Sequence, residues 1–245
     1  MPRSPFSLRA KRASLVASLL VALGPLVVAC APRPAAETPG PEVPMATLPF
    51  VPGFVPDSLM VRLTTSRGDL DVLVRTEWAP LGAQRFYEAV SSGYYDDARF
   101  FRTIRAFVAQ FGIAADSVRT HAWRARTILD DSVRQTNRRG TLVFASGGPN
   151  TRTVQLFFNL RDNPRLDALG FAPIGEIVRG HDALDALHTG YGDGATAPSQ
   201  DRLNREGEAY LAAEFPLLDK IRTARVIRTW PAAPTMANTT TPPAR

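Results

Sequence analysis

The chain has 245 residues but only one cysteine, Cys30. A single thiol cannot form an internal disulfide, and no cysteine pair is present to bind zinc. The three histidines do not form an H-E-x-x-H zinc motif, and no carboxylate cluster accompanies them. The sequence also lacks a G-x-S-x-G serine elbow and a Walker-type phosphate loop. Hydrolytic, redox and phosphoryl-transfer chemistry are therefore without their usual motifs.

Acidic residues are missing from the first 29 positions, which contain four basic residues. An apolar run over 13–29 follows the basic start and ends in VVAC at Cys30. This order is typical of a secretory signal, and the run is shorter than the about 20 apolar residues of a membrane span. The ending resembles a bacterial lipobox, so we predict a signal peptide over 1–29 and lipidation at Cys30. An ordinary signal peptide with a chance cysteine, or an uncleaved anchor, is the alternative.

The rest of the chain has little net charge. Removing residues 1–29 takes away four positive charges, so the formal net charge of +6 becomes +2. The remaining basic residues are scattered, with Arg138-Arg139 as their only adjacent pair. Nucleic-acid binding would require a basic stripe or patch, and we do not expect it.

Proline divides the chain. Residues 31–56 contain eight prolines, which favour an extended chain, and the Pro- and Thr-rich end of the chain is predicted to be disordered. We therefore expect four parts: a signal peptide over 1–29, a tether over 30–57, one folded domain over 58–230 and a tail over 231–245.

Hydrophobic periodicity predicts many short strands in the folded part. Apolar and polar residues alternate over 59–75 around Arg67-Gly68-Asp69, which indicates a β-hairpin. Further strands are expected at 100–104, 107–111, 141–145, 156–159, 172–178 and 223–230. Helices are expected between Pro80 and Gly93, at 182–188 and, at greater length, after Ser199, whereas 113–140 has weak periodicity and is interpreted as a loop. This pattern favours a closed antiparallel barrel over a parallel α/β sheet.

One stretch has an unusual composition. Residues 99–112, RFFRTIRAFVAQFG, place Arg102 among four phenylalanines. A core strand rarely contains an arginine, and a surface strand rarely carries so many phenylalanines. Taken alone, Arg102 would be interpreted as a structural ion-pair partner and the phenylalanines as core. The glycines of SGGPN, at 146–150, would likewise be interpreted as a tight turn.

Together these stretches resemble the cyclophilin-type peptidyl-prolyl cis-trans isomerases. The resemblance rests on FFRTIRAFVAQFG, on GTLVFASGGPNTRTVQLFFN and on RLDALGFAPIGEIVRGHDALDAL, and it covers most of 59–230. The middle segment, with G-P-N-T, Gln155 and Phe157, is the most specific. The resemblance implies a mainly β fold, a closed eight-stranded antiparallel β-barrel capped by two helices. This chain is expected to add a C-terminal helix.

The resemblance implies roles for ten residues. Arg102 would be catalytic, with Gln110 beside it. The residues expected to bind substrate are Phe107, Val108, Ala145, Ser146, Gln155, Phe157, Leu166 and Phe171. Phe107, Phe157 and Leu166 would hold the proline ring, and the backbone of Ala145 and Ser146 would hold the substrate chain. The implied partners are unfolded or flexible proline-containing polypeptides, and the reaction needs no cofactor or metal.

Several positions depart from the family pattern. Phe101 stands beside the arginine in place of a frequent histidine, and Arg165 occupies a place often held by tryptophan. Arg105-Ala106 replaces a frequent Pro-Gly turn. Strict alternation would put Phe107 and Gln110 on opposite faces, so a bulge or bend is expected between them.

These observations lead to one main hypothesis and two alternatives. We expect a monomeric isomerase anchored in a bacterial cell envelope, at the outer membrane facing the periplasm, because Cys30 is followed by Ala31 and not by Asp. The first alternative is a proline-peptide binding or chaperone module with weak turnover. The second is an interaction scaffold whose helix near 200–218 binds a partner.

Overall fold

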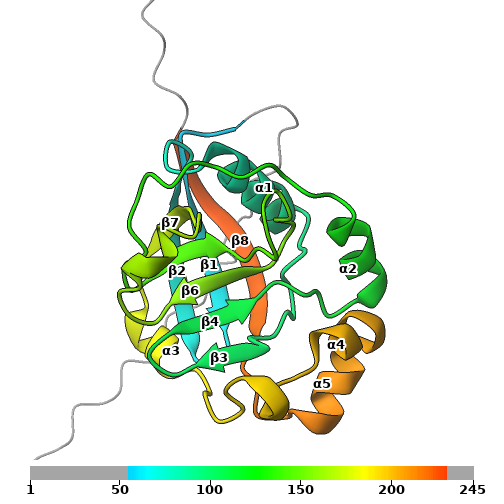
Figure 1. Ribbon diagram of the computed structural model, residues 1–245. Coiled ribbons are helices and arrows are strands. Elements are labelled where there is room, and N and C mark those ends of the chain that lie inside the picture. Colours follow the sequence, from blue (N-terminus) through cyan, green and yellow to red (C-terminus); the bar gives the residue numbers. More distant parts are fainter. Residues whose placement is uncertain (1–54, 231–245) are drawn as a thin grey trace, which may run out of the picture. The chain divides into compact units, whose positions relative to one another are not determined.

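The computed structural model describes residues 55–230 (Figure 1). The signal peptide over 1–29, Cys30, nearly all of the tether and the tail over 231–245 lie outside the described residues, so what was expected of them stays a prediction. None of the helices within 55–230 is long and apolar enough to cross a membrane.

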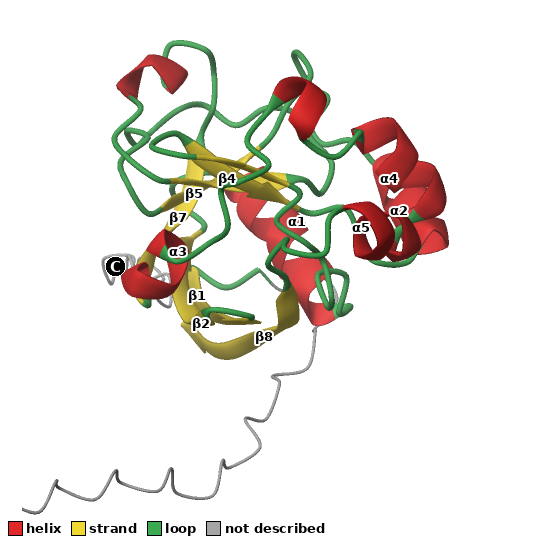
Figure 2. Cartoon of the chain, turned by 90° about the horizontal axis from the view of Figure 1, so that it is seen from below, coloured by secondary structure: helices red, strands yellow, loops and turns green. Residues whose placement is uncertain are grey.

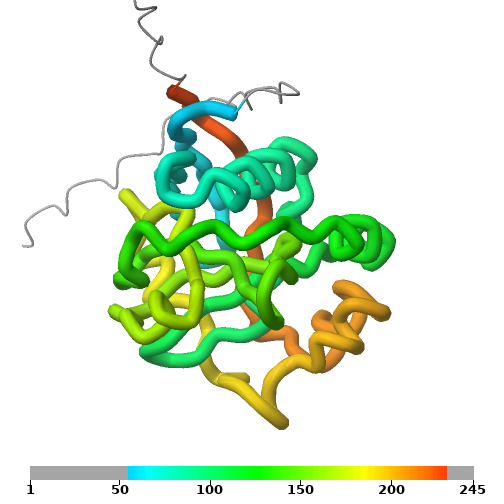
Figure 3. Tube along the Cα trace, turned by 45° about the horizontal axis from the view of Figure 1, so that its top comes forward, coloured from blue at the N-terminus to red at the C-terminus, as the bar shows by residue number. Residues whose placement is uncertain are grey.

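Eight antiparallel strands form one curled sheet in the order β3-β4-β6-β5-β7-β2-β1-β8. They are β1 (Ser58–Thr65), β2 (Gly68–Arg75), β3 (Arg102–Ile104), β4 (Val108–Phe111), β5 (Thr141–Phe144), β6 (Leu156–Asn159), β7 (Pro173–Arg179) and β8 (Ile221–Trp230). The mainly β, eight-stranded antiparallel prediction is confirmed. The first hairpin turns at Ser66-Arg67, one residue earlier than expected. The strands β1 and β8 run side by side (Figure 3), and Ser58 is opposite Trp230.

The two edges of the sheet meet through a short bridge rather than a full ladder. Arg99 and Lys220 form an isolated antiparallel bridge. Beside it, the Phe100 N–H donates to the Asp219 carbonyl at 2.9 Å, and the Ile221 N–H donates to the Ala98 carbonyl at 2.8 Å. The barrel is therefore closed only where the chain enters β3 and β8.

The core lies between the curled sheet and α1 (Pro80–Ser91) (Figure 2). Alternate residues of β1 are buried, and α1 buries Ala83, Phe86 and Val90, which share one helix face. Phe100 and Phe111 are 1% and 0% exposed, as expected for core residues. The remaining helices are α2 (Ser117–Arg124), α3 (His181–Asp185), α4 (Gln200–Glu206) and α5 (Glu208–Glu214).

The helix α2 corrects the prediction of a loop over 113–140. The Asp116 carboxylate caps its N-terminus by accepting a hydrogen bond from the Val118 N–H at 2.8 Å. Within α2 only Thr120 is fully buried, while Trp123 packs partly against the core. A helix with so small a buried face shows no apolar stripe, which is why its periodicity was weak.

The long helix expected after Ser199 is in fact two short helices that meet at Gly207. This residue has φ +62° and ψ −147°, a conformation available essentially to glycine alone. A Cβ there would lie 2.8 Å from the Ala115 carbonyl oxygen. The apolar faces of α4 and α5 are buried in a second cluster that consists of Phe101, Ile113, Leu203, Tyr210, Leu211 and Leu218.

Candidate active site

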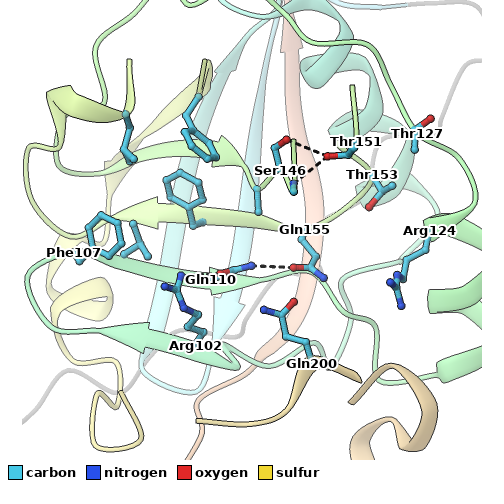
Figure 4. Close-up of a pocket in the computed structure, with 16 residues that line it drawn as sticks. Arg102, Phe107, Gln110, Arg124, Thr127, Ser146, Thr151, Thr153, Gln155 and Gln200 are labelled. Carbon is cyan, nitrogen blue, oxygen red and sulfur yellow. Dashed lines mark hydrogen bonds between the residues drawn. The ribbon is translucent and has the colours of Figure 1, made fainter. Parts of the chain in front are cut away.

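A cavity of about 640 Å³ lies over β3, β4 and β6 and the end of β5 (Figure 4). All ten residues that the sequence assigned to a site line it. Six further residues line it as well: Arg124, Thr127, Gly147, Thr151, Thr153 and Gln200. The structure therefore brings the ten residues to one place, and their individual roles stay predictions.

Cross-strand register aligns the polar centre of the cavity. Arg102 on β3 is opposite Gln110 on β4, which is opposite Phe157 on β6. Residues directly opposite one another share a face of the sheet, so the three side chains form a row. One Arg102 Nη1–H donates to Gln110 Oε1 at 3.1 Å, and Gln110 Nε2 donates to Gln155 Oε1 at 2.9 Å. This chain of bonds orients the Gln110 amide between the guanidinium and Gln155.

Phe107 reaches the cavity from a turn, because it precedes β4 rather than belonging to it. Arg102 pairs with Gln110, Thr103 with Ala109 and Ile104 with Val108, without a shift in register. The strand β4 therefore contains no bulge against β3. The bend that was expected between Phe107 and Gln110 is the β3–β4 turn itself, in which Ala106 has a left-handed φ of +53°.

One end of the cavity is apolar. Val108, Val143, Phe157 and Leu166 form a buried cluster, against which Phe107, Ala145 and Phe171 pack. The rings of Phe157 and Phe171 meet edge to face at 5.8 Å between centroids. The Arg165 guanidinium lies 5.1 Å from the centre of the Phe107 ring, at the place where the family often has tryptophan. An aromatic and aliphatic pocket of this kind can accept a compact apolar ring such as that of proline.

Three buried asparagines hold the loops of this apolar end. Asn137, Asn159 and Asn163 are at most 2% exposed. Asn163 Nδ2 donates to the Phe107 carbonyl at 3.0 Å, and Asn137 Nδ2 donates to the Phe171 carbonyl at 2.8 Å. Asn159 joins the other two, because its Nδ2 donates to Asn137 Oδ1 at 3.0 Å and its Oδ1 accepts from Asn163 Nδ2 at 2.8 Å. Sequence reasoning missed this network, since Asn137 and Asn163 lie in loops, where asparagine ordinarily indicates a turn, and Asn159 is the last residue of β6.

The other end of the cavity is polar. Thr151 Oγ1 accepts from the Gly147 N–H at 3.0 Å and donates to the Gly148 carbonyl at 2.8 Å. Thr151 therefore shapes the SGGPN turn that carries Ser146. Arg124 from α2 and Gln200 from α4 complete this end (Figure 4). Both were missed because the sequence gives no sign that these helices approach the sheet.

Asp193 contacts Arg102 from outside the cavity. Arg102 Nε donates to Asp193 Oδ1 at 3.0 Å, and Nη2 donates to Oδ2 at 2.9 Å. The hydrogen bond from Arg102, followed by one from the Gly194 N–H, lowers the pKa of the Asp193 carboxyl, so this group is ionised at neutral pH. Arg102 is thus an ion-pair partner as well as a cavity residue. A contact between positions 91 residues apart leaves no local sequence signal.

Potential metal ligands are dispersed in the described part of the chain. Over 55–230 no three His, Cys, Asp or Glu side chains are grouped so that they could hold a metal ion.

The chain that forms this site is similar in sequence to known proteins. Residues 60–206 match the family model described as cyclophilin type peptidyl-prolyl cis-trans isomerase/CLD. The peptidyl-prolyl cis-trans isomerase CYP18-1 of Arabidopsis thaliana is 31% identical over 153 residues, which are 60% of this chain and 94% of that protein. Peptidyl-prolyl cis-trans isomerase A of Dickeya dadantii is 31% identical over 146 residues, 56% of this chain and 76% of the relative.

The fold is similar to that of solved cyclophilins. A crystal structure of a cyclophilin-type isomerase from Cryptosporidium parvum covers 69% of this chain and 97% of its own, with a TM-score of 0.53 and 24% identity. A second crystal structure of that protein, in the presence of the dipeptide Ala-Pro, has a TM-score of 0.51 and covers 68% of this chain and 98% of its own at 24% identity. The family match spans more than half of the chain, and the relatives are matched over most of their length. The protein belongs to the cyclophilin-type peptidyl-prolyl cis-trans isomerases.

Proposed function

We propose that this isomerase acts on Xaa-Pro bonds of unfolded or flexible proteins in the cell envelope, with Arg102 as its catalytic residue. The observation that carries the proposal is the row of Arg102, Gln110 and Phe157, which places a guanidinium at the edge of an apolar pocket. Cyclophilin-type isomerase activity is the property of the family to which the chain belongs.

The reaction makes a modest energetic demand. Rotation about a peptide C–N bond faces a barrier of about 18–20 kcal/mol because conjugation is lost at the twist. Uncatalysed Xaa-Pro exchange takes tens to hundreds of seconds. Exchange in milliseconds requires a rate increase of about 10⁴–10⁵, which is about 5–7 kcal/mol. No bond to another atom is formed, so the site must only favour the twisted amide over the planar one.

Arg102 is suited to favour the twisted amide. When the bond twists, the prolyl nitrogen becomes pyramidal and regains a lone pair that can accept a hydrogen bond. A guanidinium has five N–H donors. Asp193 takes two of them and Gln110 takes one, so two remain for the substrate. A donor that is already oriented stabilises the transition state without reorganising during the reaction.

The pocket walls supply binding and exclude water. Phe107, Phe157 and Leu166 are assigned to the proline ring, with Val108 and Phe171 beside them. An apolar surround strengthens the hydrogen bond from Arg102, because the local dielectric constant is low. The strand end at Ala145 and Ser146 is assigned to the substrate backbone, and Gln155 positions Gln110.

Arg102→Ala tests the catalytic assignment. We expect kcat/KM for a short Xaa-Pro peptide to fall about 10²–10³-fold, as on removal of one oriented donor from an oxyanion hole. Peptide affinity should change little, because the apolar walls are intact. Arg105→Ala is the matched control, since this arginine lies in the adjacent turn and its contact is a 3.4 Å hydrogen bond to Thr189.

Binding and turnover together separate the isomerase from the binding module. If the wild type and Arg102→Ala bind the peptide equally and neither exceeds the uncatalysed rate, the catalytic assignment is wrong and the cavity is a peptide-binding groove.

The scaffold alternative has little support, because α4 and α5 direct Leu203, Tyr210 and Leu211 into the domain and not toward a partner.

The envelope location rests on the sequence around Cys30. The lipobox ending supports a lipid anchor, and the Pro-rich segment over 31–56 supports a spacer between the anchor and the domain. Mass spectrometry of the membrane-extracted protein should find a diacylglyceryl group on Cys30. Cys30→Ala should move the protein to the soluble fraction, whereas equal membrane association of both forms would contradict lipid anchoring at this residue.

A further inference from the structure

We infer that Asp193 is a positioning residue for the isomerisation, because it fixes the Arg102 guanidinium in the orientation that presents its free N–H donors to the substrate. The inference rests on the proposed role of Arg102. It adds Asp193, which lies in the loop between α3 and α4. No residue of this loop lines the cavity, so Asp193 acts on Arg102 from outside it.

The contact has the geometry of an oriented pair. The two hydrogen bonds, 3.0 Å from Nε and 2.9 Å from Nη2, run from one edge of the guanidinium to the two oxygens of one carboxylate. A bidentate pair of this kind specifies the plane of the guanidinium as well as its position. A single bond from Nη1 to Gln110, at 3.1 Å, would leave that plane free to turn.

The loop that carries Asp193 is itself held in place. Gly192 and Gly194, on either side of Asp193, have φ of +59° and +69°, so the chain turns sharply at the carboxylate. The Thr196 hydroxyl lies within hydrogen-bonding distance of the Tyr191 and Asp193 carbonyls, at 2.8 Å and 3.3 Å. The Tyr191 ring meets the ring of Phe215 edge to face at 5.1 Å. These contacts anchor the loop to the end of α5.

The pair also changes the electrostatic character of Arg102. The Asp193 carboxylate compensates the guanidinium charge, so Arg102 acts on the substrate as a directed donor. An uncompensated arginine at the mouth of a cavity would attract small anions, and these would compete with the substrate. Asp193 therefore has two effects that can be measured separately: orientation, which changes kcat, and charge compensation, which changes anion inhibition.

Asp193→Asn keeps the size of the side chain and removes its charge. We expect kcat to fall about tenfold with KM changed less than about twofold, because the proline pocket is untouched and only the donor loses its orientation. Inorganic phosphate should inhibit the variant competitively at concentrations that leave the wild type unaffected, with ionic strength held constant by sodium chloride. Asp193→Glu should recover part of the lost kcat.

Asp201→Asn is the matched control. Asp201 is an exposed acid on α4. It lines, together with Asp193 and Arg102, a smaller pocket next to the cavity. Its replacement by asparagine changes the net charge as much as Asp193→Asn does. It should keep the wild-type kcat and the wild-type response to phosphate. Thermal unfolding checks that each variant is folded, and the Asp193 side chain, which is 53% exposed, can be changed without opening the core.

Two results would overturn the inference. One is a folded Asp193→Asn variant with wild-type or higher kcat, which would show that the carboxylate does not assist the arginine. The other is an equal loss in Asp193→Asn and Asp201→Asn, which would make the effect one of net charge. If Arg102→Ala is as active as the wild type, the proposed function fails first. If Arg102→Ala is inactive and Asp193→Asn is not, only this inference fails.

Discussion

The buried asparagine network offers a quantitative test of how the proline pocket is held. Asn159 is 0% exposed and touches neither the cavity nor solvent. Its side chain makes hydrogen bonds of 3.0 Å with Asn137, 2.8 Å with Thr141 and 2.8 Å with Asn163. Asn159→Leu replaces the amide by an apolar group of similar shape, so it removes the bonds without leaving a large cavity.

The expected loss in the free energy of unfolding follows from the hydrogen bonds that Asn159→Leu removes. Three hydrogen bonds contribute about 1 kcal/mol each, and the buried Asn137 Oδ1, deprived of this donor, costs about 1–3 kcal/mol more. The added apolar surface of leucine recovers about 1–2 kcal/mol. We therefore expect Asn159→Leu to lower the free energy of unfolding by about 2–5 kcal/mol, a large part of the about 5–15 kcal/mol typical of a folded protein.

Denaturant unfolding of the wild type and the variant measures this difference, and peptide kinetics adds a functional readout. KM should rise, because the carbonyls of Phe107 and Phe171 are held by partners of Asn159. Gln135→Leu is the control, since it makes a similar change at an exposed loop position. A loss below about 0.5 kcal/mol, the usual effect of a surface substitution, would show that the network does not stabilise the fold.

Three further predictions follow from other contacts. Arg102 and Arg124 are the charged residues that line the cavity, and the charge of Arg102 is compensated by Asp193. Arg124 should therefore attract an acidic substrate. At low salt, a peptide with glutamate near its proline should have a kcat/KM about two- to fivefold above that of its lysine analogue. Arg124→Gln should abolish this preference in competition kinetics, and an unchanged preference would exclude Arg124 as its cause. Burial raises the pKa of the Tyr94 phenol from 10.0 to about 12. The unfolded chain therefore loses this proton first. The Tyr94 contribution to stability is complete below pH 10 and falls by about 2 kcal/mol as pH rises to 12. Tyr94→Phe should flatten that decline in denaturant midpoints measured from pH 9 to 12, and an identical decline would contradict the assignment. Gly207→Ala should cost about 2–4 kcal/mol of unfolding free energy, because it combines a strained backbone with a Cβ 2.8 Å from the Ala115 carbonyl oxygen. Gly170 also has a left-handed φ, of +83°, but a Cβ added there would meet no atom within 4 Å. Gly170→Ala should therefore lower the free energy of unfolding less than Gly207→Ala does. Equal losses would show that the contact with Ala115 does not contribute to the loss in Gly207→Ala.

The sequence by itself determined the strands, the family and ten of the residues that line the cavity. Strand periodicity is local, so β1 and β2 could be recognised from the alternation of neighbouring residues. The site residues lie within three continuous segments whose order of residue types is specific, and pairing of β3, β4 and β6 then places Arg102, Gln110 and Phe157 in one row.

Only the tertiary structure decided which distant polar residues serve this site. Asp193 meets Arg102 across 91 positions. Asn159, at the end of β6, is hydrogen-bonded to Asn137 and Asn163, which lie in loops. The helix α2, which brings Arg124 to the cavity, is mostly exposed and shows no apolar stripe. A polar residue has the same local signature in a solvated turn as in a buried network. Its role depends on the path of the chain around it, which hydrophobic periodicity does not encode.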